Sequence, residues 1–342
     1  MNGGRVFIPG PLTQEKGSTM KRTYLVSIVA AIAALLVLPG VGPSDMAAQG
    51  QQGQATVQGA PPQPQGRQGG GGRGGGRGGG GTARKRVLAW ADTRNGQAQH
   101  ESVGHALAVI EKLGYESGQW DTFIRTDSNI ISATPKKTDG SAASGGPNLS
   151  NVDAIFFMGH REVPLDPSQR EELLKFVREG KGFVAAHVGL TAFESWPEFL
   201  DLIGARFDGH PMNGPGVVVN ESPDSPMTRH MSASFPFTDE FYQPKDHSRD
   251  KIDVVLRLDL TGVPENPSLH LKGDHPIAWA KTYGKGRVFF GSFAHSSATW
   301  DIRDIQQMYF EAMRWALGLT DYDPKPHPMR GTAQPSGRGG GQ

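Results

Sequence analysis

Residues 152–187 of the sequence are VDAIFFMGHREVPLDPSQREELLKFVREGKGFVAAH. The mostly apolar run Val152–Met158 is typical of a buried strand. Asp166 and Pro167 then suit the N-cap and the first turn of a helix, and apolar residues follow at helical spacing. The GKG at 180–182 ends this helix and leads into a second apolar run, Phe183–His187. A strand, a helix and a strand in this order predict a parallel sheet.

The same alternation continues on both sides of this unit. Before it, Arg86–Ala91 is another apolar run, and apolar residues at helical spacing follow between Gln99 and Leu113. After it come the strand-like segments 216–220, 252–258, 275–280 and 287–291, and an amphipathic helix from about Asp301 to Leu317 closes the region. The first two of these segments are separated by Pro- and Asp-rich loops, which favours antiparallel additions to the sheet. We therefore expect one α/β domain over residues 85–320, with a mainly parallel sheet and helices on both faces.

The N-terminal segment predicts export. Lys21 and Arg22 follow Met20, and an apolar run without charge extends from Thr23 to Ser44, which is the pattern of a signal peptide. We expect residues 1–48 to be a signal region with Met20 as the true start. The mature protein is then periplasmic or extracellular, with no stable membrane span. An uncleaved signal anchor is the alternative, because a spanning helix needs about 20 apolar residues.

Two segments have a composition that cannot form a core. Residues 49–84 are rich in Gly, Gln, Pro and Arg, and residues 321–342 are similar. Such sequence buries too little apolar surface to offset its ordering entropy, so we expect a disordered linker and a disordered tail. Arg-Gly runs can bind nucleic acid through phosphate charge. The formal net charge of +1 and the export signal favour a spacer and no nucleic-acid partner.

Histidines follow several of the predicted strands. In open α/β sheets, ligands bind outside the carboxyl ends of the strands. His100, His160, His187 and His295 all come soon after predicted strands, and Glu101 and Arg161 stand beside two of them. A single histidine is more often structural than functional. Four histidines from four segments at one edge of the sheet instead indicate a binding or catalytic site.

These residues lie in a series of motifs that resembles the ThuA-like (trehalose utilisation) family. The motifs are AQHES at 98–102, GKGFVAAHVGLTAF at 180–193, Trp196-Pro197, GARFDGHP at 204–211, TDEFY at 238–242, HPIAWAKTYGKGRVFF at 275–290 and AHSSATW at 294–300. The resemblance covers about 86–318. It implies a flavodoxin-like, doubly wound sheet similar to that of class I glutamine amidotransferases, and an association with trehalose and related sugars. Many members carry an Ala-Thr-Asp-like run after the histidine that matches His187, whereas this chain has Val188–Phe193 and no acidic neighbour there.

The amidotransferase comparison excludes one mechanism. In those enzymes a nucleophilic cysteine occupies the strand-to-helix turn where this chain has His187, and the base histidine lies near the position of His295. The sequence contains no cysteine. Attack by a thiolate on an amide is therefore excluded, and the protein is not a Cys-dependent glutaminase.

The first hypothesis is acid–base chemistry on a sugar or an oxidised sugar derivative. In this hypothesis His187, His295 and Glu240 are catalytic, because imidazole both accepts and donates protons near neutral pH. Isomerisation, hydration or cleavage of a carbon–oxygen bond would all fit. The residues expected to contact the sugar are His100, Glu101, His160, Arg161, Trp196, Asp239, Tyr242 and Trp300, in which the aromatic rings offer stacking faces and Asp239 orients the ring.

Two further hypotheses stay open. His100, His187 and His295, with a carboxylate, match the ligands of a divalent metal such as zinc, although no compact HxxxH or HExxH spacing is present. A metal is compatible with the first hypothesis if it polarises a sugar carbonyl. The other hypothesis is a non-catalytic carbohydrate-binding or scaffold module, which would bind a sugar without turnover.

Overall fold

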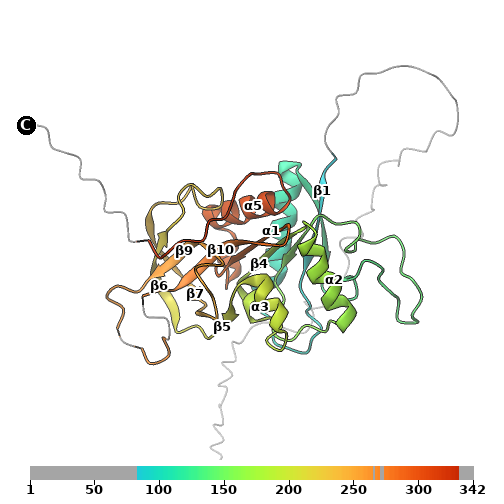
Figure 1. The fold of residues 1–342 in the computed structure, drawn as a ribbon, viewed down its shortest axis with the longest axis horizontal. Helices are drawn as coiled ribbons and strands as arrows, with labels where there is room; N and C mark the ends of the chain where they lie inside the picture. The colour runs from blue at the N-terminus through green and yellow to red at the C-terminus, as the bar shows by residue number, and fades with distance from the viewer. Residues whose placement is uncertain (1–82, 265, 270–272, 331–342) are drawn as a thin grey trace, which may run out of the picture. The chain divides into compact units, whose positions relative to one another are not determined.

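The computed structural model describes residues 83–330 except 265 and 270–272 (Figure 1). The predicted signal region, the linker up to residue 82 and the tail beyond 330 lie outside the described residues. Export therefore stays a prediction. Within the described part of the chain, every helix is too short or too polar to span a bilayer.

A nine-stranded mixed sheet forms the centre of the molecule. Its parallel half contains, in spatial order, β2 (Trp120–Arg125), β1 (Lys85–Trp90), β3 (Ala154–Phe157), β4 (Gly182–Ala186) and β11 (Gly286–Gly291). The antiparallel half continues with β10 (Pro276–Tyr283), β9 (Asp253–Asp259), β6 (Met212–Asn220) and β7 (Ser234–Phe241). A separate pair joins β5 (Arg206–Phe207) to β8 (Pro244–Lys245). The predicted fold class, a mainly parallel sheet with antiparallel additions, is confirmed.

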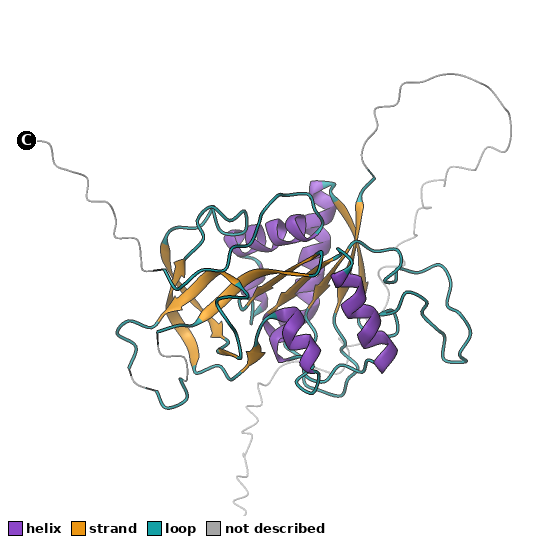
Figure 2. Ribbon diagram, in the orientation of Figure 1, coloured by secondary structure: helices purple, strands orange, loops and turns teal. Residues whose placement is uncertain are grey.

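Helices cover both faces of the sheet (Figure 2). On one face, α1 (Ser102–Ser117) and α5 (Arg303–Ala316) pack against the sheet, and on the other face α2 (Pro167–Arg178) and α3 (Pro197–Ile203) do so. Each face has its own apolar core because the strands alternate their side chains between the two sides. The short helices η1 (His187–Thr191) and α4 (Ser297–Trp300) follow β4 and β11.

The sequence signals that predicted α2 correspond to real contacts. Asp166 accepts a hydrogen bond from the backbone N–H of Gln169, and the Gln169 side chain accepts one from the backbone N–H of Asp166. Pro167 lies in the first turn, where its missing N–H costs nothing. Such a cap contributes about 1 kcal/mol. It fixes the beginning of the helix that connects β3 to β4.

The order of the parallel strands determines where a ligand can bind. Numbered along the chain, the five strands lie in the order 2-1-3-4-5, because β11 is the fifth parallel strand. Connections from β1 and β3 leave in opposite directions, so a crevice opens at the carboxyl ends of these strands. His100, His160, His187 and His295 all lie in segments that leave this edge.

The C-terminal segment differs from the expected loose tail. Between residues 321 and 330 the chain lies against β9 and the end of β6. The Tyr322 hydroxyl and the Lys325 backbone N–H both donate to the buried carboxylate of Asp253. The Arg330 backbone N–H donates to Glu221 at 3.1 Å. Composition predicted disorder for this segment. That prediction was wrong for residues 321–330, because composition does not reveal the polar partners that hold them.

Candidate functional site: a His/Glu quartet at the sheet edge

Four side chains from four separate segments meet at the carboxyl edge of the parallel strands. His100 lies between β1 and α1, His187 follows β4 directly, His295 follows β11, and Glu240 lies near the end of β7. One ligand atom from each lies within 4.8 Å of all the others. We call these four residues the His/Glu quartet. The structure thus brings together the three histidines that were considered as metal ligands and adds Glu240 as the carboxylate.

The distances within the quartet resemble those within a set of metal donors. Glu240 Oε2 lies 3.0 Å from His295 Nδ1, 3.4 Å from His187 Nε2 and 3.9 Å from His100 Nε2. His187 Nε2 and His295 Nδ1 are 3.2 Å apart. Four tetrahedral donors about 2.1 Å from a zinc ion would be about 3.4 Å from one another. The donor types fit a divalent first-row ion. These four pairs of atoms lie near this spacing and all pairs lie within 4.8 Å, so a bound ion would draw the donors slightly closer together.

His187 is oriented by contacts outside the quartet. Its Nδ1–H donates to the Ser292 carbonyl oxygen at 2.7 Å, and its ring stacks on Tyr242 with the centroids 4.0 Å apart. Donation from Nδ1 leaves the lone pair on Nε2, which faces the quartet. Burial lowers the pKa of His187, although Glu240 and Ser292, which would stabilise a protonated ring, oppose this effect. The ring is therefore held neutral, which is the form that binds a metal.

The two adjacent carboxylates, Asp239 and Glu240, have different environments. Burial would raise the pKa of Glu240, but the imidazoles of His100 and His187 beside it hold that pKa well below its usual range. Asp239 accepts the backbone N–H groups of Ala294 at 2.8 Å and His295 at 3.3 Å. Burial raises the pKa of Asp239, and these bonds oppose the shift. Asp239 was expected to orient a sugar, but its bonds instead hold the loop that carries His295.

Unusual backbone conformations gather at this edge of the sheet. Arg161, His187 and Ala294 have φ angles of 59°, 38° and 88°. Residues other than glycine rarely adopt this region, and each instance costs about 1–3 kcal/mol. His187 makes the sharp turn from β4 into η1, and Ala294 directly precedes His295. Packing around the site therefore enforces the directions in which His187 and His295 point.

His100, Glu240 and His295 line a hollow of about 410 Å³, whereas the fully buried His187 is not among its lining residues. The lining contains the predicted residues His100, Glu101, His160, Arg161, Glu240, Tyr242 and His295. It also contains Gln99, Thr191, Phe207 and His210, which the sequence reasoning did not assign to the site. His210 Nδ1 lies 3.5 Å from Glu240 Oε1. The GARFDGHP motif contains both Phe207 and His210 and was the available signal for them.

His160 and Glu101 lie beside the quartet and not within it. His160 Nδ1–H donates to the Ala98 carbonyl oxygen at 2.8 Å, so its lone pair is on Nε2. Burial lowers the pKa of His160. Glu101 accepts the backbone N–H of Ser297 at 2.7 Å and also the Ser297 hydroxyl, so its carboxylate anchors the start of α4 at the rim of the hollow.

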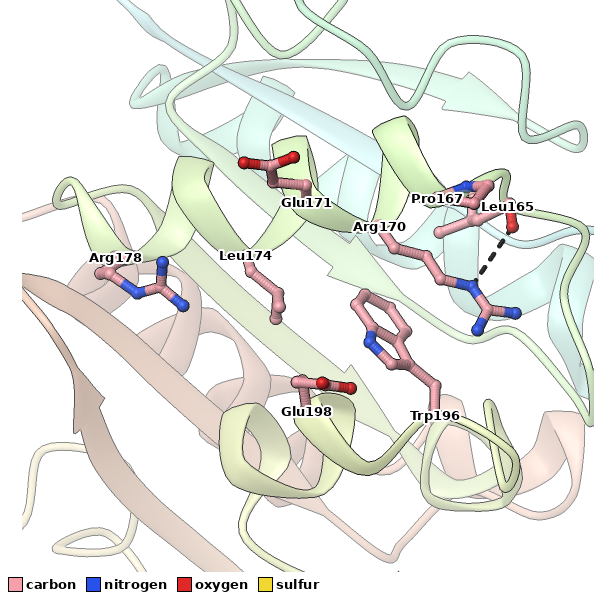
Figure 3. Close-up of a pocket in the computed structure, with 8 residues that line it drawn as sticks. All are labelled: Leu165, Pro167, Arg170, Glu171, Leu174, Arg178, Trp196 and Glu198. Carbon is pink, nitrogen blue, oxygen red and sulfur yellow. Dashed lines mark hydrogen bonds between the residues drawn. The ribbon is translucent and has the colours of Figure 1, made fainter.

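Two predicted sugar-binding tryptophans lie elsewhere. Trp300 is fully buried and stacks on Tyr309 with the centroids 4.7 Å apart. Trp196 packs among phenylalanines beneath α3 and lines a different hollow between α2 and α3, where the Arg170 guanidinium lies over its ring (Figure 3). Neither ring faces the quartet. The prediction that they stack on the sugar in this site is therefore not supported by their positions, which are those of core residues.

His275 supports the site from within the core. It is fully buried, and its Nε2–H donates to the carbonyl oxygen of Tyr242 at 3.1 Å. The Tyr242 N–H donates to the Ser292 hydroxyl at 3.0 Å, and Ser292 also accepts from His187. His275 thus fixes the strand end from which the Tyr242 ring reaches His187.

A pH dependence of stability follows from the burial of His275. Burial lowers the pKa of His275 to about 4, whereas the unfolded side chain titrates near about 6.5. Between these values only the unfolded state binds the proton, so stability falls as the pH falls. We expect a loss of up to about 3 kcal/mol between pH 7 and pH 4 from this residue. Urea unfolding at both pH values measures it, and a His275→Gln chain with an unchanged pH dependence would contradict it.

The strand order and the position of the site define a flavodoxin-like α/β protein, the class to which the glutamine-amidotransferase fold belongs. The chain belongs to the ThuA family, whose model is described as trehalose utilisation and matches residues 86–316. Its family description suggests a carbohydrate-related role. No curated protein matches the sequence.

Solved structures agree with this fold. A ThuA-like protein from Bacteroides uniformis matches with a TM-score of 0.56 and 20% identity, over 71% of this chain and 95% of that one. A ThuA-like protein from Parabacteroides merdae matches with a TM-score of 0.53 and 15% identity, over 69% of this chain and 90% of that one. At these identities the likeness concerns the fold alone.

Proposed function

We propose that this protein is a metal-dependent enzyme that acts on a carbohydrate, with one divalent first-row ion such as zinc held by the His/Glu quartet. The observation that carries the proposal is the quartet itself, in which three imidazole nitrogens and one carboxylate oxygen converge within 4.8 Å. Neutral imidazole and carboxylate are common ligands of such ions. The carbohydrate part of the proposal is supported by the family description.

The quartet is open to ligands on one side. The side chains of His100 and His295 are 18% and 41% exposed, whereas those of His187 and Glu240 are 0% and 8% exposed. The side of the quartet next to His100 and His295 therefore faces the hollow. A ligand in the hollow could bind the ion from this side, because zinc can accept a fifth ligand. A bound ion supplies Lewis-acid chemistry there by polarising a carbonyl or hydroxyl oxygen of the sugar.

Two histidines of the hollow remain for proton transfer once the quartet holds an ion. His160 has a pKa lowered by burial and a lone pair on Nε2, so it can accept a proton at neutral pH. His210 borders the quartet through Glu240. The acid–base role predicted for His187 and His295 thus passes to His160 in this proposal. Isomerisation, hydration and carbon–oxygen cleavage all remain consistent with one ion beside one base.

Turnover tests this proposal on the full chain, in zinc-loaded and chelator-treated forms, with trehalose and 3-keto-glycosides as substrates. We expect turnover that requires the metal. His160→Asn should lower kcat by about 10²–10⁴-fold at unchanged metal content. His105→Asn is the matched control, because His105 pairs with Asp301 outside the hollow. Saturable sugar binding without turnover in the wild type would instead favour a non-catalytic binding module.

A further inference from the structure

Arg161 is held at the rim of the hollow by its backbone. Its φ of 59° places it in the left-handed region. Its N–H donates to the Thr191 hydroxyl at 3.4 Å, and its carbonyl oxygen accepts the N–H of Phe193 at 3.2 Å. These contacts with the η1 segment fix where the side chain leaves the loop after β3. Arg161 lines the hollow, and its backbone position there does not depend on the bonds of its side chain.

The guanidinium has an aromatic neighbour and a weak anionic one. It lies 5.8 Å from the centroid of the Phe207 ring. Its ion pair with Glu194 is 3.3 Å long, and the two side chains are 43% and 54% exposed. Exposed pairs of this kind contribute little and are exchanged easily. A ligand carboxylate or phosphate that enters the hollow can replace Glu194 and form the bidentate pair that arginine favours.

The other charged groups of the hollow do not prevent an anion from binding. Glu101 is engaged by the N–H and hydroxyl of Ser297, and Glu240 belongs to the quartet. With a divalent ion in the quartet, the charges of the lining sum to a positive value, which attracts an anion. A neutral sugar carries no net charge and gains less from this field than an anion does.

An apolar surface that includes the Phe207 ring lies beside the Arg161 guanidinium. Phe207 meets Tyr242 edge to face with the centroids 4.6 Å apart, and His210 lies 6.1 Å from Phe207. Phe207 is partly buried and lines the hollow. The C–H face of a sugar ring can pack on this surface, a role that the sequence had assigned to Trp196, Tyr242 and Trp300, of which Tyr242 lines the hollow. The hollow's volume of about 410 Å³ lies within the range of small-molecule sites.

We infer that the ligand of this site is an anionic sugar, whose carboxylate or phosphate binds Arg161 while its ring packs on Phe207 and its oxygens face the quartet. This inference rests on the proposed function, because the orientation of the sugar, with its oxygens toward the quartet, assumes that the quartet holds the metal ion. It adds the substrate class, which the family description does not give. Arg161 is then a specificity-determining residue.

Calorimetric titration of the full chain tests the inference. The probes are D-glucuronate, D-glucose 6-phosphate and D-glucose, each added to zinc-loaded and to chelator-treated protein, with the metal content measured for every sample. We expect at least one of the two anions to bind the zinc-loaded protein at least 10-fold more tightly than glucose. The stronger of the two anions identifies whether carboxylate or phosphate is preferred. Added salt should weaken the binding of the anion but not the binding of glucose, because salt screens interactions between charges.

Variants locate the effect. Arg161→Gln should lose at least 10-fold in anion affinity, with glucose affinity and metal content unchanged. Arg170→Gln is the matched control, because Arg170 also lies over an aromatic ring but in the other hollow (Figure 3). Equal affinities for both anions and glucose, or an unaffected Arg161→Gln chain, would overturn the inference. An anion preference that depends on Arg161 in a protein that binds no zinc would support this inference and refute the proposed metal.

Discussion

A His187→Ala chain should bind zinc at least 100-fold more weakly than the wild type. The substitution removes one of the four donors, and it removes the one whose ring is fixed by Ser292 and Tyr242. Loss of contacts that merely orient a ligand already costs about 10–100-fold in metal affinity, and loss of the ligand should cost more. The measurement is zinc content after dialysis, together with the shift of thermal unfolding on adding zinc.

The thermal shift gives this prediction a magnitude. Zinc at 1,000 times its Kd should stabilise the wild type by about 4 kcal/mol, and His187→Ala at the same concentration far less. Glu240→Gln is a second variant, because it keeps the shape of the side chain and removes its charge. His105→Ala should behave as the wild type, since His105 lies outside the quartet. If zinc does not raise the unfolding temperature of the wild type, the prediction is wrong whatever the variants show.

The second large effect is expected at Glu221, far from the quartet. Its side chain is fully buried and pairs with Arg249 at 2.8 Å and with Arg257 at 2.9 Å. It also accepts the backbone N–H of Arg330. Glu221→Ala leaves Arg249 with Asp274 at 2.7 Å and Arg257 with Asp259 at 3.8 Å as their remaining carboxylate partners. Removing one partner of a buried ion pair costs about 3–5 kcal/mol when the other charge is left uncompensated, which sets the upper end of the expected loss. We therefore expect a large loss of stability and release of the C-terminal segment.

Urea unfolding measures the stability change, and limited proteolysis near residue 330 measures the release. Glu116→Ala is the control, because the Lys112–Glu116 pair is more than half exposed on both sides. An exposed helix pair of this kind should contribute about 0.3–0.5 kcal/mol. A Glu221→Ala chain that unfolds within 1 kcal/mol of the wild type would contradict the account of the C-terminal segment.

The sequence predicted the buried strands of the parallel half and missed the two strands at the edges of the sheet. The apolar runs at β1, β3, β4 and β11 are continuous because helices cover them from both sides. β2 lies at the edge of the sheet, where Trp120 is buried and the other five residues are half-buried or exposed. β7 forms the opposite edge and contains Pro236 among exposed residues. Neither strand gives a continuous apolar signal.

In the candidate site, too, residues that follow apolar strands could be predicted, whereas residues placed by contacts between distant segments could not. The rule that ligands bind at the carboxyl ends of parallel strands was enough to group His100, His160, His187 and His295. Glu240, which the acid–base hypothesis had included, falls outside this rule because it enters from β7, an antiparallel strand whose place in the sheet depends on contacts between distant segments. The buried positions of Trp196 and Trp300 likewise arise from packing, and an aromatic residue in a motif gives no information on which way its ring points. His210 and Phe207 are brought to the hollow by the short β5–β8 pair, which has no strong sequence signal.

Anomalous diffraction from crystals grown with zinc, with data collected at the zinc absorption edge, would show whether the quartet holds the ion. We expect one strong peak about 2.0–2.2 Å from His100 Nε2, His187 Nε2, His295 Nδ1 and a Glu240 carboxylate oxygen. A map with no peak between these four atoms, from crystals that contain zinc at other positions, would contradict this expectation.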